Sequence, residues 1–145
     1  MAGFSINIDD SSFKRCLNVL KVIKNDLSKQ IDDELNASVQ SMATLAKQKA
    51  PAKTGRLRGS IVSLKVQFLS YQLKANTNYA AYVEFGTGQK YKNYKSLLDN
   101  EWRDIASKYF VTGKGFTNPQ PFFYPSVKQE KVKLYKNLQN ILTNK

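Results

Sequence analysis

The sequence predicts an α+β fold in which a long N-terminal helix and a C-terminal helix pack on a small antiparallel β-sheet, with a mobile insertion. Apolar residues recur at helical spacing over residues 13–46 and again over 127–141. Between them, residues 61–68 and 71–75 are rich in β-branched and aromatic residues. With 145 residues, of which 41% are apolar, the chain can form one hydrophobic core, so we expect a single domain over residues 1–145.

The N-terminal helical region is expected over residues 11–50. There is no Gly or Pro between Gly3 and Pro51, and Pro51 disfavours helical backbone at the residue before it. The stretch fits either one helix or two helices joined near residues 28–33, where polar residues are densest. A helix that outruns a small domain needs other surfaces to cover its apolar stripe, which favours self-association.

The sheet is expected within residues 58–85, after a basic, turn-rich loop. Residues 61–68 and 71–75 predict an antiparallel hairpin that turns near residues 69–70. Residues 79–85 fit either a third strand or a short helix, because seven residues do not separate the two periodicities.

Residues 88–115 predict an insertion that leaves the core. Glycines flank this segment, and its aromatic residues lie among many charges. This composition favours mobility in an isolated subunit and ordering against a neighbour. The C-terminal helix is then expected over residues 125–143, with Pro125 in its first turn.

The composition argues against catalysis. The chain has no His, which is the usual general base near neutral pH and the commonest metal ligand, and it has one Cys. The glycine-rich phosphate loop with Lys and Ser or Thr is missing, and no local pair of carboxylates supports glycosidase or metal chemistry. We therefore predict that the chain is not an enzyme and requires neither a metal nor another cofactor.

The charge of the chain predicts its partners. It has 23 Lys and Arg against 11 Asp and Glu, a net charge of +12, which favours polyanions. Lys and Tyr mixed over residues 90–95 are typical of nucleic-acid binding, although a solvated basic surface has the same composition. The N-terminus does not resemble a secretory signal, and no apolar run has the roughly 20 residues that a membrane span needs. We expect synthesis in a reducing cytoplasm and no membrane partner.

Three separated segments are more specific than composition. They are Ala50-Pro51-Ala52-Lys53-Thr54-Gly55-Arg56-Leu57-Arg58-Gly59-Ser60-Ile61, then Tyr79-Ala80-Ala81-Tyr82-Val83-Glu84-Phe85-Gly86-Thr87-Gly88, then Pro121-Phe122-Phe123-Tyr124-Pro125-Ser126-Val127. In this order after an N-terminal helix, they resemble the small head-to-tail joining and tail-component proteins of lambdoid, long-tailed double-stranded DNA phages. The resemblance covers roughly residues 30–140. The chain departs from the family pattern in its long insertion and in its extension before about residue 27.

The resemblance implies a structural virion protein at the neck or at the head-proximal end of the tail, made in the cytoplasm of the host bacterium. It implies a homo-oligomeric ring, with six subunits as the expected number, and contacts with other neck or tail proteins. Weak contact with genomic DNA would also follow, because the genome passes through such a ring. The alternative function is a basic nucleic-acid-binding protein, and a toxin or inhibitor is a more distant one.

Two sets of residues are selected as candidate site residues. The first set forms structural turns, where Gly permits positive φ or close backbone approach and Pro limits a helix: Pro51, Gly55, Gly86, Gly88, Pro121 and Pro125. The second set is predicted at the interface with another subunit or partner: Lys53, Arg56, Arg58, Glu84, Asp32, Asp33 and Glu34.

The charges of the interface set suggest how its members pair. Glu84 is isolated among basic residues, and we expect it either to pair with Arg56 or Arg58 or to be exposed without a partner. A ring contact joins two different surfaces. The acidic group at residues 32–34 is therefore predicted to meet Arg56 and Arg58 of the next subunit.

Overall fold

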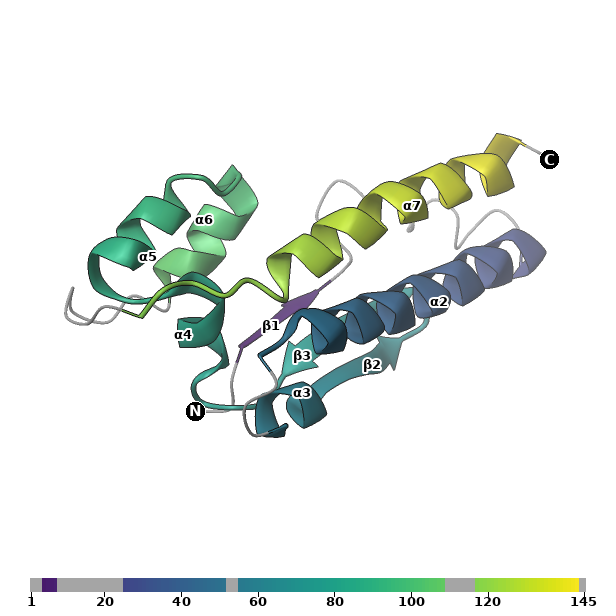
Figure 1. Ribbon diagram of the computed structural model, residues 1–145. Coiled ribbons are helices and arrows are strands. Elements are labelled where there is room, and N and C mark those ends of the chain that lie inside the picture. The colour runs from purple at the N-terminus through teal and green to yellow at the C-terminus, as the bar shows by residue number, and fades with distance from the viewer. Residues whose placement is uncertain (1–3, 8–24, 52–54, 109–116, 144–145) are drawn as a thin grey trace.

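Two long helices lie side by side over a small sheet (Figure 1). The structure is a computed structural model that describes residues 4–7, 25–51, 55–108 and 117–143. Its elements are β1 (Phe4–Asn7), α2 (Asn25–Lys49), α3 (Arg56–Ser60), β2 (Ile61–Gln67), β3 (Ser70–Ala75), α4 (Ala80–Phe85), α5 (Gly88–Lys95), α6 (Asn100–Ser107) and α7 (Tyr124–Thr143). The predicted α+β fold, with a long N-terminal helix, a C-terminal helix and a small antiparallel sheet, is confirmed.

Helix α2 is the central element, because it contacts β2 and β3 on one side and α7 on the other. It is unbroken through residues 28–33, where the sequence allowed a junction between two helices. The apolar stripe that the sequence predicted is buried over its described part, at Ile31, Leu35, Val39, Met42 and Ala46. The part of the predicted helical region that precedes Asn25 lies outside the described residues.

The sheet occupies less of the chain than the predicted 58–85 region, and one of its strands comes from outside that region. It has three antiparallel strands in the order β1-β3-β2, with Ile61 paired to Ala75 and Gln67 to Ser70. Its third strand is β1, which the sequence analysis did not find because four residues carry too little periodicity. Residues 56–60 and 80–85, at the two ends of the predicted region, are helical.

Helix α4 resolves the ambiguity at residues 79–85 in favour of a helix. Its buried residues are Ala80, Ala81, Glu84 and Phe85, which recur at helical rather than alternating spacing. The helix ends at Gly86, whose φ of 76° is open to glycine and whose N–H donates to the carbonyl of Tyr82 at 2.8 Å.

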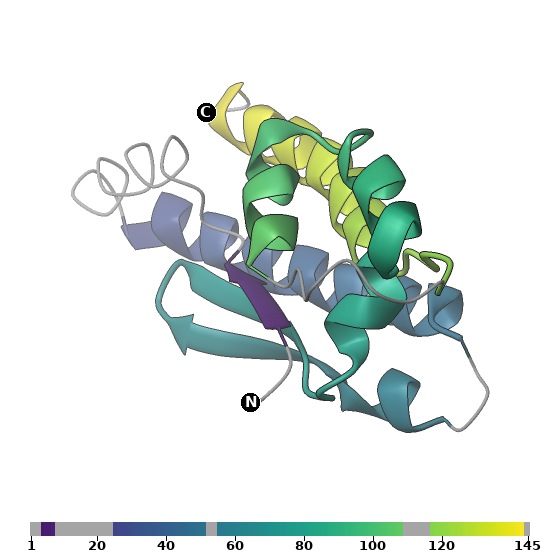
Figure 2. The same cartoon turned by 90° about the vertical axis from the view of Figure 1, so that its left-hand side faces the viewer.

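The prediction that residues 88–115 leave the core is wrong for the part that the structure describes. Helices α5 and α6 lie beside α4 and the start of α7 (Figure 2), and Tyr91, Leu98, Trp102 and Ala106 are buried. The indole ring of Trp102 lies edge-on to Tyr124, with ring centroids 4.9 Å apart. The segment has few apolar residues, but Trp102 and Ala106 are one turn apart on α6 and are both buried. These contacts pack α6 on the core. Its predicted mobility stays a prediction, and residues 109–116 lie outside the description.

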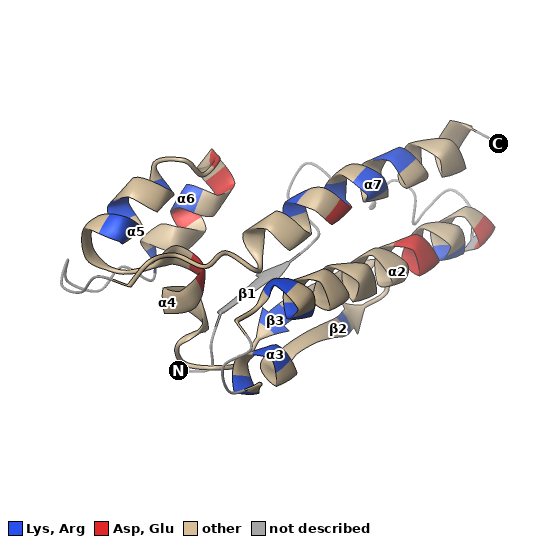
Figure 3. Cartoon of the chain, in the orientation of Figure 1, with Lys and Arg blue, Asp and Glu red and all other residues tan. Residues whose placement is uncertain are grey.

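Charged residues gather on particular elements. Figure 3 shows Lys and Arg along α3, α5 and α7, and acidic residues on α2, on α4 and at the start of α6. Within residues 4–7, 25–51, 55–108 and 117–143, no helix has both the length and the hydropathy of a membrane span.

Candidate functional site at the junction of the three motifs

Glu84 joins the second motif to the third. Its carboxylate accepts hydrogen bonds from the backbone N–H groups of Phe122 and Phe123, both at 2.8 Å, and of Tyr124 at 2.9 Å. The side chain is completely buried. Glu84 therefore lies in the interior, and the predicted pairing with Arg56 or Arg58 and the alternative of an exposed side chain are both wrong.

The position of Glu84 has a physical reason in the first turn of α7. The first N–H groups of a helix have no partner within the helix, and the helix dipole places partial positive charge there. The segment that enters α7 supplies these donors, and Glu84 reaches them from α4. Burial raises the pKa of Glu84 to about 7, against the lowering effect of the three N–H groups.

Gly86 lets the segment before α7 approach the end of α4. A Cβ atom built at Gly86 would lie 2.8 Å from the carbonyl oxygen of Thr117 and 2.9 Å from the backbone nitrogen of Pro119. The contact is reinforced by Thr87, whose N–H donates to that carbonyl oxygen at 3.0 Å and whose hydroxyl accepts from the N–H of Thr117 at 2.9 Å. The Gln120 N–H donates to the carbonyl of Val83 at 2.7 Å. Val83, Glu84, Gly86 and Thr87 of this motif therefore all contact the segment that leads into α7.

The first motif forms the turn between α2 and the sheet. Gly55 has φ of 70°, as predicted for a turn glycine, and precedes α3. Leu57 is buried, and the guanidinium of Arg58 donates to the carbonyl of Ala50 at 3.0 Å across the loop. Arg58 thus links the two ends of this turn.

A groove of about 400 Å³ lies where the first two motifs meet the segment that precedes the third. Its lining comes from the first motif, from α4 and from the segment before the third motif: Pro51, Arg56, Leu57, Tyr79, Val83, Thr117 and Gln120. Within the described residues, no cluster of side chains has the composition of a metal site. The lining mixes three aliphatic side chains with Tyr79, Thr117, Gln120 and the charged Arg56.

Asp32 holds the hairpin of β2 and β3 on α2. Its carboxylate accepts from the N–H of Leu69 at 2.8 Å, the hydroxyl of Tyr71 at 3.0 Å and the ammonium of Lys65 at 3.0 Å. Burial acts to raise the pKa of Asp32, but these hydrogen bonds outweigh it and the pKa lies below its usual range. Asp32 is buried, so its predicted role at a subunit interface is wrong.

The other predicted interface residues are placed differently. Asp33 and Arg56 are exposed. Glu34 is half-buried and accepts from the side-chain amide of Asn137 on α7 at 2.7 Å. Lys53 lies outside the described residues. The structure does not bring Arg56 and Arg58 into contact with residues 32–34 within one chain, so pairing between subunits stays a prediction.

The contacts between the second and third motifs are mainly buried hydrogen bonds to backbone groups. The chain belongs to the HK97-gp10-like family: the family model described as "Bacteriophage HK97-gp10, putative tail-component" matches residues 13–86. It is therefore a phage tail component, as its three motifs indicated. No curated protein and no solved structure gives a significant match to the chain.

Sequence reasoning selected Glu84 because it is an isolated acid among basic residues, and it assigned Glu84 the wrong partner. An isolated acid within a motif signals a specific contact, but the donors are backbone N–H groups, which no residue type reveals. The role of Asp32 was missed because its partners are 33 to 39 residues away. The available signal was an acid beside the predicted apolar stripe, one position after Ile31 and three before Leu35.

Proposed function

We propose that this chain completes the phage tail at the neck, where it joins head and tail as a homo-oligomeric ring of six copies. Membership of a tail-component family supports a structural role in the virion. Its partners are other copies of the chain and other neck or tail proteins, with weak contact to the genomic DNA that passes through the ring.

The observation that carries the proposal is an exposed apolar surface on strand β2. Leu64 is 44% exposed, Val66 is 59% exposed and Phe68, directly after the strand, is 44% exposed. Leu64 and Val66 are two positions apart in β2, and β2 is at the edge of the described sheet. Phe68 follows a register irregularity between Lys65 and Gln67, and its ring lies 5.8 Å from the Lys65 amine. An apolar edge strand is a surface that monomeric proteins usually protect. Another subunit would cover it.

The polar part of the interface consists of Lys53, Arg56 and Arg58 on one subunit and Asp33 and Glu34 on the next. Two different surfaces are needed for a head-to-tail contact that closes into a ring. Charges at the rim of such a contact mainly set its register and association rate. Salt should therefore slow assembly, while the apolar contact holds the formed ring together.

The proposal is tested by measuring the mass of the purified protein by sedimentation and native mass spectrometry. We expect a closed oligomer for the wild type and monomers for Leu64→Lys with Val66→Lys, because a charge on the covered face is costly to bury. The control Leu97→Lys with Leu142→Lys changes two exposed apolar residues elsewhere in the chain and should assemble. A monomeric wild type, or an assembled β2 variant, would contradict the proposal.

A further inference from the structure

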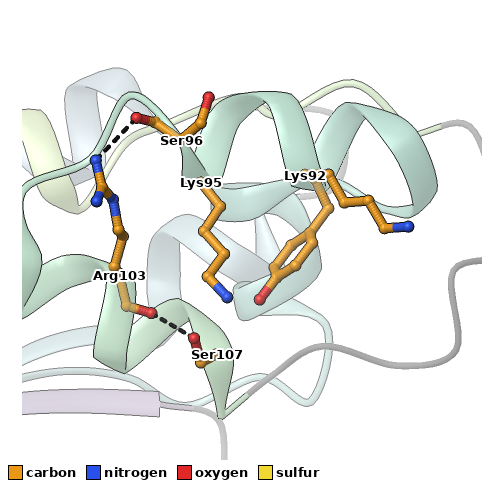
Figure 4. A pocket seen from close by; sticks show the side chains of 6 residues that line it. Lys92, Lys95, Ser96, Arg103 and Ser107 are labelled. Atoms are coloured by element: carbon orange, nitrogen blue, oxygen red, sulfur yellow. Dashed lines mark hydrogen bonds between the residues drawn. The ribbon is translucent and has the colours of Figure 1, made fainter.

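The cavity between α5 and α6 has a volume of about 520 Å³ and mainly apolar walls (Figure 4). The guanidinium of Arg103 donates to the carbonyl of Ser96 at 3.1 Å at one end of it. The amine of Lys95 lies apart from that end, 6.0 Å from the centre of the Tyr91 ring. These two cations do not converge on one ligand. The outer edge of strand β2, in contrast, presents hydrogen-bonding groups in a regular row.

Strand β2 has an unpaired edge within the described part of the sheet. The strand order β1-β3-β2 places it at one side, where β3 is its neighbour. Successive residues of an antiparallel strand turn their N–H and C=O groups alternately toward the partner strand and away from it. The bonds at the start of β2 fix this alternation. The N–H of Asn76 donates to the carbonyl of Ser60 at 3.2 Å, whereas the N–H of Ile61 donates to the carbonyl of Arg58 on the other side.

The backbone groups of Ser63 and Lys65 therefore point to the outer edge. Even-numbered residues of β2, such as Val62 and Leu64, continue the pattern of Ser60 and bond to β3. Odd-numbered residues continue the pattern of Ile61 and turn away from β3. The alternation holds as far as Lys65, where the register becomes irregular. Each outward residue offers one donor and one acceptor to a further strand.

The usual protections of an edge strand are few in β2. The strand contains neither Pro nor Gly, and its irregularity comes only at the hairpin end. Its single charge, Lys65, is held at 3.0 Å by the carboxylate of Asp32 on α2. Leu64 and Val66 are exposed. Because natural monomers protect such an edge with charges, prolines or bulges, this one is expected to pair with another strand.

The chain supplies a second edge that runs in the same direction. Strand β1 lies at the opposite side of the described sheet, where β3 is its neighbour. Both β1 and β2 are antiparallel to β3, so they are parallel to each other. A rotation about an axis along the strands therefore brings β1 of the next copy beside β2, and the same contact repeats until a ring closes. Pairing of β2 with β2 of another copy would instead stop at a dimer.

We propose that β2 accepts strand β1 of the next copy as a parallel neighbour, so that one continuous sheet runs around the oligomer. This pairing rests on the ring proposed above for the chain and names its backbone contact. The N–H and C=O groups of Ser63 and Lys65 bond to β1 of the next copy. Helix α2, which contacts β2 and β3, then lies on the same face of the sheet in every copy.

Hydrogen exchange, read residue by residue, tests the pairing in the unaltered protein. The N–H groups of Ser63 and Lys65 should exchange at least about tenfold more slowly in the assembled protein than in the dilute monomer. The N–H groups of Val62 and Leu64 are the internal control, because they bond to β3 and should be protected in both states.

A substitution at Ser63 tests the same hydrogen bond. Ser63→Pro removes an outward N–H and leaves the bonds to β3 in place, since Pro is tolerated on edge strands where the N–H faces away from the partner. It should raise the concentration needed for assembly at least about tenfold. Ser63→Ala keeps the N–H and should assemble like the wild type. Thermal unfolding establishes that both variants are folded.

Disulfide formation identifies the partner strand in a Cys16→Ser background, which removes the one native cysteine. Oxidation of Leu64→Cys combined with Ser5→Cys or with Asn7→Cys should give a ladder of covalent oligomers for at least one of the two pairs. Within one chain β3 separates these strands beyond the reach of a disulfide. Leu64→Cys alone should give no covalent product.

The outcomes separate this pairing from the proposed ring. An assembled protein in which Ser63 and Lys65 stay unprotected would overturn the strand pairing and leave the ring proposal standing. Covalent dimers from Leu64→Cys alone would show that β2 pairs with itself and would also overturn it. A wild type that is monomeric at every concentration would overturn both proposals.

Discussion

At the scale of single residues, the protonation of Glu84 should control stability. Its pKa rises from an ordinary 4.5 in the unfolded chain to about 7 in the folded protein because burial disfavours the charged form. Between these values the folded state binds more protons than the unfolded state, so the free energy of unfolding falls as the pH rises. Below about pH 4.5 the contribution is fully present, and above about pH 7 it is lost.

We therefore expect the free energy of unfolding to decrease by about 3 kcal/mol between pH 4.5 and pH 7 through Glu84 alone. Glu84→Gln cannot titrate and should remove this part of the pH dependence. It should also lower stability near pH 5, because its amide NH₂ would face a backbone N–H and leave one donor unsatisfied. Urea unfolding at several pH values measures both effects. Parallel pH curves for wild type and variant would contradict the assignment.

Asp32 and Asp33 provide a matched pair on neighbouring positions of α2. Asp32→Asn should lower the free energy of unfolding by about 1–3 kcal/mol, since it weakens the acceptor of Leu69, Tyr71 and Lys65. Asp33→Asn should change it by less than about 0.5 kcal/mol, because Asp33 is exposed. The lowered pKa of Asp32 means that its contribution is lost as the pH falls below about 4. Equal effects of the two variants would remove Asp32 from the structural role.

At the scale of elements, the end of α4 depends on a backbone approach that only Gly86 permits. Gly86→Ala should destabilise the protein by about 2–4 kcal/mol, because it combines a positive φ with a clash against Thr117 and Pro119. The control Gly59→Ala has no atom within 4 Å of its new Cβ and lies in helix α3. It should be neutral or slightly stabilising. Thermal unfolding of the two variants distinguishes these outcomes, and similar melting temperatures would show that the approach is not needed.

The elements also show where sequence patterns succeed. Helices α2 and α7 were predictable because each repeats an apolar stripe over several turns. Strand β1 and helices α3 and α4 were not, because four to six residues contain too few repeats. The mixed composition of α5 and α6 suggested exposure, yet the ring of Trp102 packs on Tyr124, which follows 22 positions later in the chain. Contacts between distant parts of the chain, rather than local composition, therefore determine that this segment is buried.

At the scale of the whole molecule, the sequence predicted the fold class and the three motifs but not how the motifs meet. Hydrophobic periodicity specifies which face of an element is buried without naming the element that covers it. The groove at Arg56, Val83 and Gln120 depends on such pairings. The cavity between α5 and α6 likewise depends on the packing of two helices, although the basic charge of Lys95 and Arg103 was visible in the sequence.

The contact between Glu84 and α7 has a consequence for synthesis. A ribosome that has just made Glu84 will make its donor N–H groups 38 to 40 residues later, a delay of about 2 to 8 seconds at typical bacterial rates. Helix α7, which covers one side of α2, is made later still. During this interval the nascent chain holds an uncovered apolar helix and an unbound carboxylate. Binding by a chaperone would therefore be most useful after α4 is made and before α7 has left the ribosome.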